Sequence, residues 1–359
     1  MRKLATIRRI SDIQPIDGAD RIEVATVNGW KVVVAKGVGH QIGDLVVYCE
    51  IDSFLPIRPE YEFLRKSSYK KMSDGSEGFR LRTVKLRGQV SQGLILPIRV
   101  FEDYGYGIGK DRTDSTVLFV TDPETMEYKQ VTLGDDVSDL LDIVKYDPPL
   151  PAQLAGQAKG YFPSFIPKTD EERIQNLTEE YPEYLNSGKR FYTTEKLNGS
   201  SATFYLKDGD FGVCSRNLEL KEDDKNTFWR VAREMKLEEK MSELGGNYAI
   251  QGELIGEGIQ KNPYKIKGHT VRFFNVFDID HQERVSLEHM GDIIISMGLE
   301  TVPMLFDSPL PRTIDDLLAA ADGKSELNPE TDREGLVIRS DDQEISFKAI
   351  SNQFLLNEK

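Results

Sequence analysis

The sequence predicts an α+β protein of two domains. Its 359 residues are too many for one ordinary core, since domains commonly contain about 100–200 residues. Short apolar segments separated by glycine turns fill the first part, whereas helical patterns alternate with strands in the second. Five prolines between Asp147 and Pro167 separate the two parts. We therefore expect a first domain over residues 1–147, a linker over 148–167 and a second domain over 168–359.

The first domain reads as a series of short strands. Asn28-Gly29 lies between two apolar segments and is a strong signal for a two-residue hairpin. The expected strands are Ile22–Val27, Trp30–Ala35, Leu45–Cys49, Phe79–Leu86 and Gly93–Pro97. Many short strands without a long helix favour a small closed barrel, of which the OB type commonly binds nucleic acid. A two-sheet sandwich is the alternative.

The segment between the domains predicts extended chain. Proline lacks the amide proton that helices and central strands need. The prolines concerned are Pro148, Pro149, Pro151, Pro163 and Pro167. After them, residues 170–177 have the composition of a helix, with Thr169 as its cap and acidic residues in its first turn.

Strands and helices are mixed in the second domain. A helix is expected from Phe228 to Leu244, capped near Asn226-Thr227 and ended by Gly245-Gly246. Two more helices are expected near 287–297 and 314–321. The expected strands are Tyr192–Glu195, Ser201–Lys207, Phe211–Ser215, Tyr248–Leu254, Val271–Asp278, Gly335–Arg339 and Glu344–Ala349.

Hydropathy and cysteine content argue against a membrane, secreted or zinc-binding protein. No segment approaches the roughly 20 apolar residues that cross a bilayer, and the first residues lack the apolar stretch of a signal peptide. Cys49 and Cys214 make neither a disulfide framework nor a zinc-ligand spacing. We therefore expect a cytoplasmic protein without a membrane partner.

The net charge of −14 argues against nucleic acid, because phosphate binding depends on Lys and Arg. The segment from Arg58 to Arg87 reverses this balance, with nine basic and four acidic residues and four interleaved aromatic rings. It could bind phosphates and stack on bases. The candidates for nucleic-acid contact are Arg80, Arg82, Lys85 and Arg87. The alternative is a solvated loop whose rings belong to the core.

Lys196 is the candidate nucleophile. A lysine side chain in water titrates near pH 10.4, so a nucleophilic lysine must be desolvated or set beside a cation. Lys196 ends an apolar strand, and Asn198-Gly199 forms a tight turn through which backbone can approach a ligand. Alone, such a string is more often an ordinary surface turn.

Further polar residues follow apolar strands downstream. Arg216 lies in Ser215-Arg216-Asn217, and Glu253 interrupts an apolar strand. Phe274 supplies a ring that could lie against a purine. Glu334 precedes the apolar strand Gly335–Arg339, and Lys348 lies among apolar neighbours. Each has an ordinary structural explanation, but their order along one chain is distinctive.

The order of these residues resembles the nucleotidyltransferase motifs of covalent ligases and capping enzymes. The matching segments are Lys196-x-Asn198-Gly199, Ser215-Arg216-Asn217, Gly252-Glu253-Leu254, Phe274, Glu334-Gly335-Leu336-Val337 and Lys348. The run from Gly252 to Gln260 is particularly similar to RNA ligases. An OB-like domain before the transferase domain, and the segment Asp170–Asn176, resemble the fifth family of RNA ligases. The resemblance spans nearly the whole chain.

The resemblance implies an ATP-dependent RNA ligase of RNA repair. Lys196 would take AMP from ATP, the AMP would pass to a 5′-phosphate, and a 3′-hydroxyl would displace it. Glu253 and Glu334 would hold Mg²⁺ or Mn²⁺, and Lys348 would contact the α-phosphate. Arg216 and Glu253 would address the ribose, Phe274 would stack on adenine, and the backbone around Glu195, Leu197, Asn198 and Gly199 would hold the nucleotide. The implied partner is a nicked duplex with RNA at its 3′-hydroxyl side, bound by a monomer.

Two positions depart from the family pattern. Asn198 stands where DNA ligases generally have Asp, and Ser346 replaces the first lysine of a common K-x-K pair, so phosphate orientation would depend on other basic residues. The alternatives are a DNA ligase, a capping-type nucleotidyltransferase, and a nucleic-acid-binding protein without catalysis. The amino-terminal barrel and Asn198 argue against the first two, and the intact motif residues argue against the third.

Overall fold

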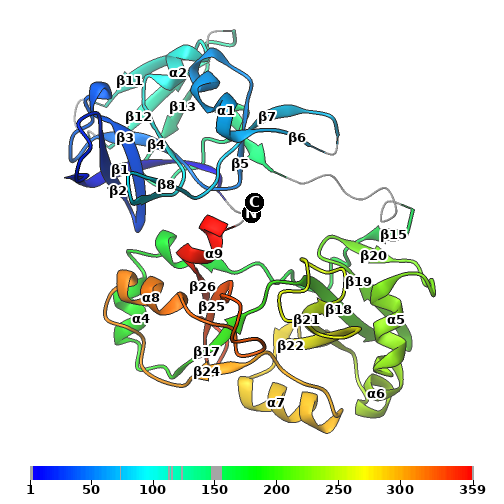
Figure 1. Cartoon of the computed structure of the whole chain (residues 1–359). Coiled ribbons are helices and arrows are strands. Elements are labelled where there is room, and N and C mark those ends of the chain that lie inside the picture. The colour runs from blue at the N-terminus through cyan, green and yellow to red at the C-terminus, as the bar shows by residue number, and fades with distance from the viewer. Residues whose placement is uncertain are drawn as a thin grey trace. The chain divides into compact units, whose positions relative to one another are not determined.

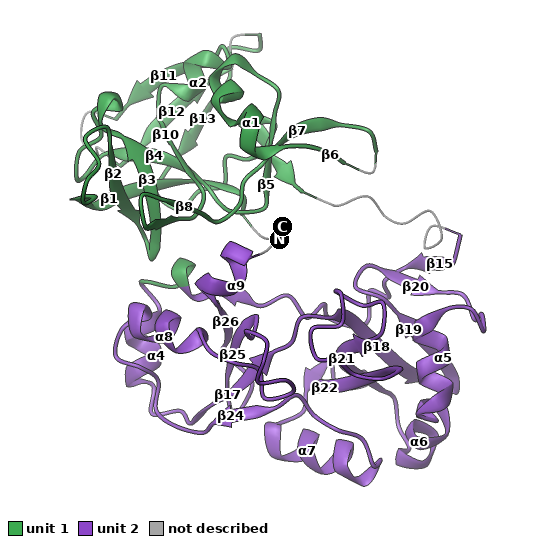
Figure 2. Ribbon diagram, in the orientation of Figure 1, with its two compact units in different colours: residues 1–150, 175–178 green, residues 151–174, 179–359 purple. Residues whose placement is uncertain are grey.

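The computed structural model divides the chain into two compact units (Figure 1, Figure 2). It describes residues 3–72, 74–111, 114, 116–122, 124–146 and 156–357. The first unit contains Met1–Leu150 and Gln175–Thr178, and the second contains Pro151–Ile174 and Glu179–Lys359. Pro148, Pro149 and Pro151 of the expected linker lie outside the described residues. Sheets and helices are mixed, which confirms the α+β class.

One five-stranded antiparallel sheet organises the first unit. Its strands, in spatial order, are β10 (Leu94–Pro97), β4 (Leu45–Cys49), β1 (Ala5–Pro15), β2 (Ile22–Val27) and β3 (Trp30–Ala35). β1 pairs with β4 through its first half and with β2 through its second. The register shifts between Ile10 and Asp12, and such a bulge lets one strand bend to serve two neighbours. This curvature is that of a barrel, as the short strands predict.

Three smaller sheets and short helices complete this unit. The strands are β14 (Val144–Lys145), β5 (Ser53–Pro56), β7 (Glu77–Arg80) and β6 (Tyr69–Lys71) in one sheet, β11 (Gly107–Lys110), β12 (Leu118–Thr121) and β13 (Tyr128–Val131) in another, and β8 (Val84–Leu86) with β9 (Gln89–Ser91). The helices are η1 (Lys36–Val38), η2 (Pro59–Leu64), α1 (Arg65–Ser68), α2 (Val100–Asp103) and η3 (Asp139–Leu141). Ile7, Val47, Phe79 and Phe101 are fully buried in their common core.

The predicted hairpin is confirmed, but one predicted strand is wrong. β2 and β3 have the expected bounds, and Asn28 in their turn has φ 49. Residues 79–86 do not form one strand. β7 ends at Arg80, and β8 belongs to a separate hairpin that turns at Arg87-Gly88. Leu81 still bonds to Ser53 beside β5, and its carbonyl oxygen accepts the Asp52 amide proton.

A seven-stranded antiparallel sheet forms half of the second unit. Its strands, in spatial order, are β15 (Ala158–Tyr161), β20 (Leu218–Leu220), β19 (Asp210–Cys214), β18 (Ser200–Lys207), β21 (Tyr248–Gly256), β22 (His269–Asp278) and β23 (Glu283–Arg284). Three helices pack on it, namely α5 (Thr227–Glu234), α6 (Leu237–Leu244) and α7 (Leu287–Ser296). Trp229, Met241 and Ile294 from these helices bury against Phe204 and Phe273 of the sheet.

The single helix predicted over Phe228–Leu244 is two helices. The predicted cap is confirmed, since the Asn226 side chain accepts the amide protons of Phe228 and Trp229. The break lies at Lys236, which takes a left-handed φ of 54. This redirection places Leu237 and Met241 of α6 in the same core as α5, so tertiary packing overrides the continuous helical pattern.

The other half is a five-stranded sheet. Its order is β16 (Glu172–Arg173), β26 (Ser346–Ile350), β25 (Gly335–Ser340), β17 (Phe191–Lys196) and β24 (Met304–Phe306). The associated helices are α4 (Tyr181–Asn186), α8 (Ile314–Ala321) and α9 (Asn352–Asn357), whereas η4 (Ile174–Asn176) begins in the second unit and ends in residues assigned to the first.

The helix predicted over residues 170–177 is wrong. The segment forms β16, which pairs parallel with β26, followed by the short turn η4. Sheet pairing and a buried ion pair of Glu171 outweigh the local helical composition.

Candidate functional site

The Lys196 site lies where the two sheets of the second unit meet. β17 pairs Lys196 with Gly335 and Glu195 with Leu336 of β25 in the five-stranded sheet. Residues 197–199 then carry the chain into β18 of the seven-stranded sheet. There Ser201 pairs with Glu253 of β21. One tight turn therefore brings residues from both sheets around the Lys196 side chain.

Lys196 and Glu334 form an ion pair. Nζ of Lys196 lies 2.6 Å from Oε1 of Glu334, and their side chains are 26% and 17% exposed. The register of β17 against β25 causes this, because Glu334 directly precedes the partner of Lys196. The pair is thus partly shielded from water. Two opposite charges attract more strongly there than they would at the fully exposed surface.

Glu253 brings a second carboxylate to the same place. Its Oε1 accepts the Gly199 amide proton at 3.1 Å. Burial and the nearby charge of Glu334 raise the pKa of Glu253 to about 7, although Lys196 opposes the shift. A Cβ on Gly199 would lie 2.5 Å from the Leu254 carbonyl oxygen and 2.8 Å from Glu253 Cγ. Only glycine permits this close approach.

The two carboxylates suit a divalent metal ion. Oxygen ligands of this kind are what Mg²⁺ and Mn²⁺ prefer, usually together with water and substrate phosphates. A cation between Glu253 and Glu334 would offset the repulsion that raises the pKa of Glu253. Within the described residues, no group of three or more His, Cys, Asp or Glu side chains could hold a metal by itself.

The residues after Lys196 form an apolar floor. Leu197 is buried with Ile255, Tyr264 and Val302, and the Phe274 ring packs against this cluster. Phe274 is only partly buried. Nearby, the Glu195 carboxyl is buried and accepts the Glu326 amide proton at 2.8 Å, and burial raises its pKa. The predicted adenine-stacking ring is therefore beside the Lys196 turn.

Arg339 contacts both the backbone and the ring of Phe274, which the sequence analysis did not predict. Its Nη1 donates to the Phe274 carbonyl oxygen at 2.6 Å, and its guanidinium carbon lies 5.5 Å from the ring centroid. Nη2 pairs with Glu171 at 2.7 Å, with side chains 5% and 8% exposed. The available signal was a charged residue at a buried position of an apolar strand.

Ser346 belongs to this buried network. Its hydroxyl donates to Glu171 Oε2 at 2.5 Å. Burial would raise the pKa of Glu171, but Arg339 and the Ser346 hydroxyl hold it below its ordinary value. Ser346 therefore fixes the Glu171 carboxylate. Lys348, two residues on, lies opposite Val337 of β25 and Arg173 of β16.

Arg216 lies at the edge of the Lys196 site. It follows β19 and pairs with Asp170 at 2.6 Å, and both side chains are more than half exposed. Its charge lowers the pKa of Glu253 against the dominant effect of burial. Arg216 is thus near enough to act electrostatically on the site while remaining largely in solvent.

The four basic candidates of the first unit differ in their surroundings. Arg80 is held by Asp52 at 2.7 Å and lies 4.9 Å from the Tyr146 ring centroid. Arg82 donates to the Ser67 carbonyl oxygen at 3.2 Å. Lys85 and Arg87 are exposed on the β8–β9 hairpin, where Arg87 takes φ 50 in the turn. The hairpin pair is the better placed for phosphate contact.

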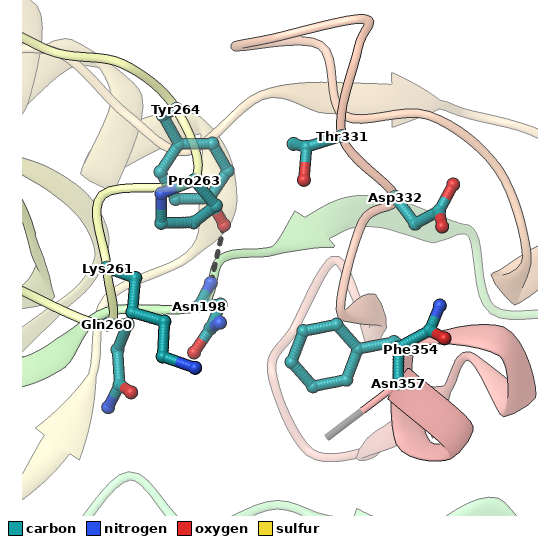
Figure 3. Close-up of a pocket in the computed structure, with 9 residues that line it drawn as sticks. All are labelled: Asn198, Gln260, Lys261, Pro263, Tyr264, Thr331, Asp332, Phe354 and Asn357. Atoms are coloured by element: carbon teal, nitrogen blue, oxygen red, sulfur yellow. Dashed lines mark hydrogen bonds between the residues drawn. The ribbon is translucent and has the colours of Figure 1, made fainter. Parts of the chain in front are cut away.

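A pocket of about 370 Å³ opens beside the Lys196 turn (Figure 3). Its lining residues are Asn198, Gln260, Lys261, Pro263, Tyr264, Thr331, Asp332, Phe354 and Asn357. The Asn198 amide proton is donated to the Tyr264 hydroxyl oxygen at 2.6 Å. The pocket therefore shares a wall with the turn that follows Lys196.

None of the helices in the described part of the chain has the length and apolar character needed to cross a membrane.

Comparisons with known proteins extend this picture. A family model described as an OB-fold domain matches residues 4–98, and one described as RNA ligase matches residues 189–350. No curated protein matches the sequence.

Among solved structures, a lysine-to-methionine mutant of Naegleria gruberi RNA ligase with AMP and Mn is 41% identical. Its TM-score is 0.86, and the match covers 99% of each chain. A lysine-to-alanine mutant of that enzyme with ATP and Mn is 40% identical with the same TM-score and coverage. The enzyme with PPi is 41% identical with a TM-score of 0.85, covering 99% of this chain and 98% of that one.

Proposed function

The chain belongs to the RNA ligase family and is an ATP-dependent RNA ligase that uses a divalent metal ion, and we propose that Lys196 is its AMP-accepting nucleophile. The observation that carries this proposal is the Lys196–Glu334 ion pair, with Glu253 beside it and Phe274 on the adjoining floor. Three of these residues lie in the strands β17, β21 and β22, and Glu334 directly precedes β25. They therefore gather an amine, two carboxylates and an aromatic ring near one turn.

In the first step, Nζ of Lys196 attacks the α-phosphorus of ATP. An N–P bond forms, the bond to the bridging oxygen breaks, and pyrophosphate leaves with the bonding electron pair. The ammonium proton must depart before attack, and Glu334 Oε1 is the group in contact with it. The protein contributes in-line positioning and neutralisation of charge, as in other phosphoryl transfers.

We assign the remaining roles from the motif resemblance. Phe274 stacks on adenine, while the backbone of Glu195, Leu197, Asn198 and Gly199 holds the nucleotide. Arg216 and Glu253 contact the ribose, and Lys348 contacts the α-phosphate. Glu253 and Glu334 would hold Mg²⁺ or Mn²⁺, which would neutralise charge on the phosphates. The Arg339–Glu171 pair supports Phe274 from behind.

Two further transfers complete the reaction. A 5′-phosphate oxygen of the nucleic acid attacks the lysyl phosphoramide, so that AMP passes to the 5′ end and Lys196 regains its amine. A 3′-hydroxyl then attacks that 5′ phosphorus, AMP leaves, and a phosphodiester forms. We propose that the substrate is a nick in a duplex with RNA at the 3′-hydroxyl side, as in RNA repair.

The first unit would bind that duplex. We propose an OB-like nucleic-acid-binding domain over residues 1–147, a linker over 148–167 and a nucleotidyltransferase domain over 168–359. Lys85 and Arg87, supported by Arg80 and Arg82, would contact phosphates. A cytoplasmic monomer is part of the proposal. The buried free thiols of Cys49 and Cys214 favour a reducing compartment.

Nicked duplexes of matched sequence test this function. One carries ribonucleotides at the 3′-hydroxyl side of the nick, and the other is wholly DNA. The 2′-hydroxyl is the group that distinguishes the two ends. We expect rapid sealing of the first and slow sealing of the second. Equal rates on both would refute the RNA preference, and failure to seal either would refute the nick as substrate.

A further inference from the structure

The pocket beside the Lys196 turn is lined, apart from Asn198, by residues to which we assign no part in AMP uptake. Four segments line it, namely the turn at Asn198, the loop at Gln260–Tyr264, residues 331–332, and helix α9. Figure 3 shows the Phe354 ring of α9 across the pocket from Asn198 and Lys261. The volume of about 370 Å³ lies at the lower end of the range for small-molecule sites.

Two walls of the pocket are hydrogen-bonded to residues of the Lys196 site. The Gln260 side chain donates to the Gly199 carbonyl oxygen at 3.3 Å. The Ser351 amide proton, at the start of α9, is donated to the Glu334 carbonyl oxygen at 2.9 Å. Asp322 accepts the Ser351 hydroxyl proton at 2.6 Å and so fixes the same end of α9. A group bound in the pocket therefore lies at a set position relative to the nucleophile.

One wall contains strained backbone. Gln260, Lys261 and Asn262 take left-handed φ values of 45, 64 and 49 in succession. Residues with side chains rarely adopt this conformation, and such strain concentrates at functional sites. The Asn262 side chain sustains it, since its amide group both donates to and accepts from the Ile266 backbone. The turn presents Gln260 and Lys261 to the pocket.

The lining has the chemistry of a nucleotide site with a single phosphate. Phe354 offers a ring to a base, and the amide groups of Asn198, Gln260 and Asn357 offer donors and acceptors to a base edge or a ribose. Lys261 is the one cation among the lining residues, and Asp332 is the one carboxylate. Pyrophosphate would need several cations, which this lining does not provide.

We propose that this pocket takes the 3′-terminal ribonucleotide of the strand whose hydroxyl closes the nick, with its base against Phe354 and its phosphate at Lys261. The proposal rests on the proposed function, because it supplies the acceptor end for the third transfer. Asn198 joins the two sites, since it follows the nucleophile and also lines the pocket.

The test measures phosphodiester formation, the third transfer, separately from AMP uptake, the first. The probe is a nicked duplex that already carries AMP on its 5′ end, so that only phosphodiester formation is measured. Phe354→Ala should slow this reaction about tenfold, the size of a lost base–aromatic stack, whereas Phe354→Tyr should not. Lys261→Gln should raise the nick concentration needed for half-maximal sealing, and Lys261→Arg should restore it. AMP uptake should stay within about twofold in all four variants.

A second nick provides the matched control. Its 3′-terminal ribose lacks a base, so Phe354→Ala should have no further effect on it. An equal loss on both nicks would overturn the proposal, and so would a parallel fall in AMP uptake, which would assign the pocket to ATP. Failure of the proposed function is distinguishable, because the unaltered enzyme would then take up no AMP or seal no nick.

Discussion

Nζ of Lys196 lies 2.6 Å from Oε1 of Glu334, although 138 positions separate the two residues in the sequence. Strand register explains the contact, because Lys196 pairs with Gly335, the residue after Glu334. The contact depends on close packing, since Gly335 has φ 158 and a Cβ there would lie 2.3 Å from the Ala349 carbonyl oxygen. Replacing Gly335 would displace Glu334 from Lys196.

Glu334→Gln should abolish AMP uptake while leaving the fold intact. The change keeps the size of the side chain but removes the charge that faces Lys196 and, by our proposal, the metal ion. We expect at least about a 100-fold fall in the rate of AMP uptake, measured in a single turnover. Glu344→Gln is the matched control, because Glu344 is exposed and pairs with Lys189 away from the site. Similar losses in both variants would contradict the role of Glu334.

Glu253→Gln should stabilise the metal-free protein at high pH. Burial raises the pKa of Glu253 from 4.5 to about 7, so the native state keeps this proton to a higher pH than the unfolded chain. Ionisation therefore costs stability as the pH rises from about 4.5 to 7, and the full penalty remains above pH 7. The free energy of unfolding of the variant minus that of the wild type should be larger at pH 8 than at pH 4.5. We expect this increase to be about 1–3 kcal/mol.

Urea unfolding at the two pH values, with chelator present, measures this difference. A stability difference that does not change with pH would show that Glu253 carries no penalty in the native state.

Arg339→Ala should weaken both stability and ATP binding. It removes one partner of a buried ion pair and leaves the buried Glu171 carboxylate without its paired cation, which typically costs about 3–5 kcal/mol. It also frees the Phe274 backbone, so the KM for ATP should rise. Ser346→Ala removes only the hydroxyl bond to Glu171 and should cost about 1–3 kcal/mol. An unchanged KM in Arg339→Ala would limit the pair to a structural role.

Replacing Lys85 and Arg87 by Ala should weaken nick sealing and reduce its dependence on salt. Both side chains are exposed on the β8–β9 hairpin, and each lost phosphate contact lowers the salt slope by about 0.9. AMP uptake should be unchanged. Arg80→Ala should instead reduce stability, because Arg80 is bound to Asp52. A parallel loss of AMP uptake in the hairpin variant would indicate a structural role for Lys85 and Arg87.

The sequence pattern correctly predicted those parts of the fold that depend on interactions between residues close together in the chain. The Asn28-Gly29 hairpin and the Asn226 cap depend on turn and capping chemistry that a few residues specify. Residues 170–177 were misread because β16 exists only by pairing with β26, more than 170 positions away. The single helix over 228–244 was misread because the core, and not the sequence pattern, sets the turn at Lys236.

In the candidate site, too, some features could be predicted from the sequence and others could not. The order of Lys196, Glu253, Phe274 and Glu334 is visible in the sequence, and their roles remain proposals. The support of Phe274 by Arg339, the contact of Ser346 with Glu171 and the pocket at Phe354 depend on long-range packing. No spacing along the chain specifies such contacts.

Transfer of label from ATP to the protein tests the central claim most directly. Purified protein is incubated with Mg²⁺ and ATP labelled at the α-phosphate, and bound label is counted after denaturation. We predict one acid-labile label per molecule, released by pyrophosphate, with none on Lys196→Ala. Label on Lys196→Ala equal to that on the wild type would contradict the assignment of Lys196, and label from GTP alone would contradict ATP as the substrate.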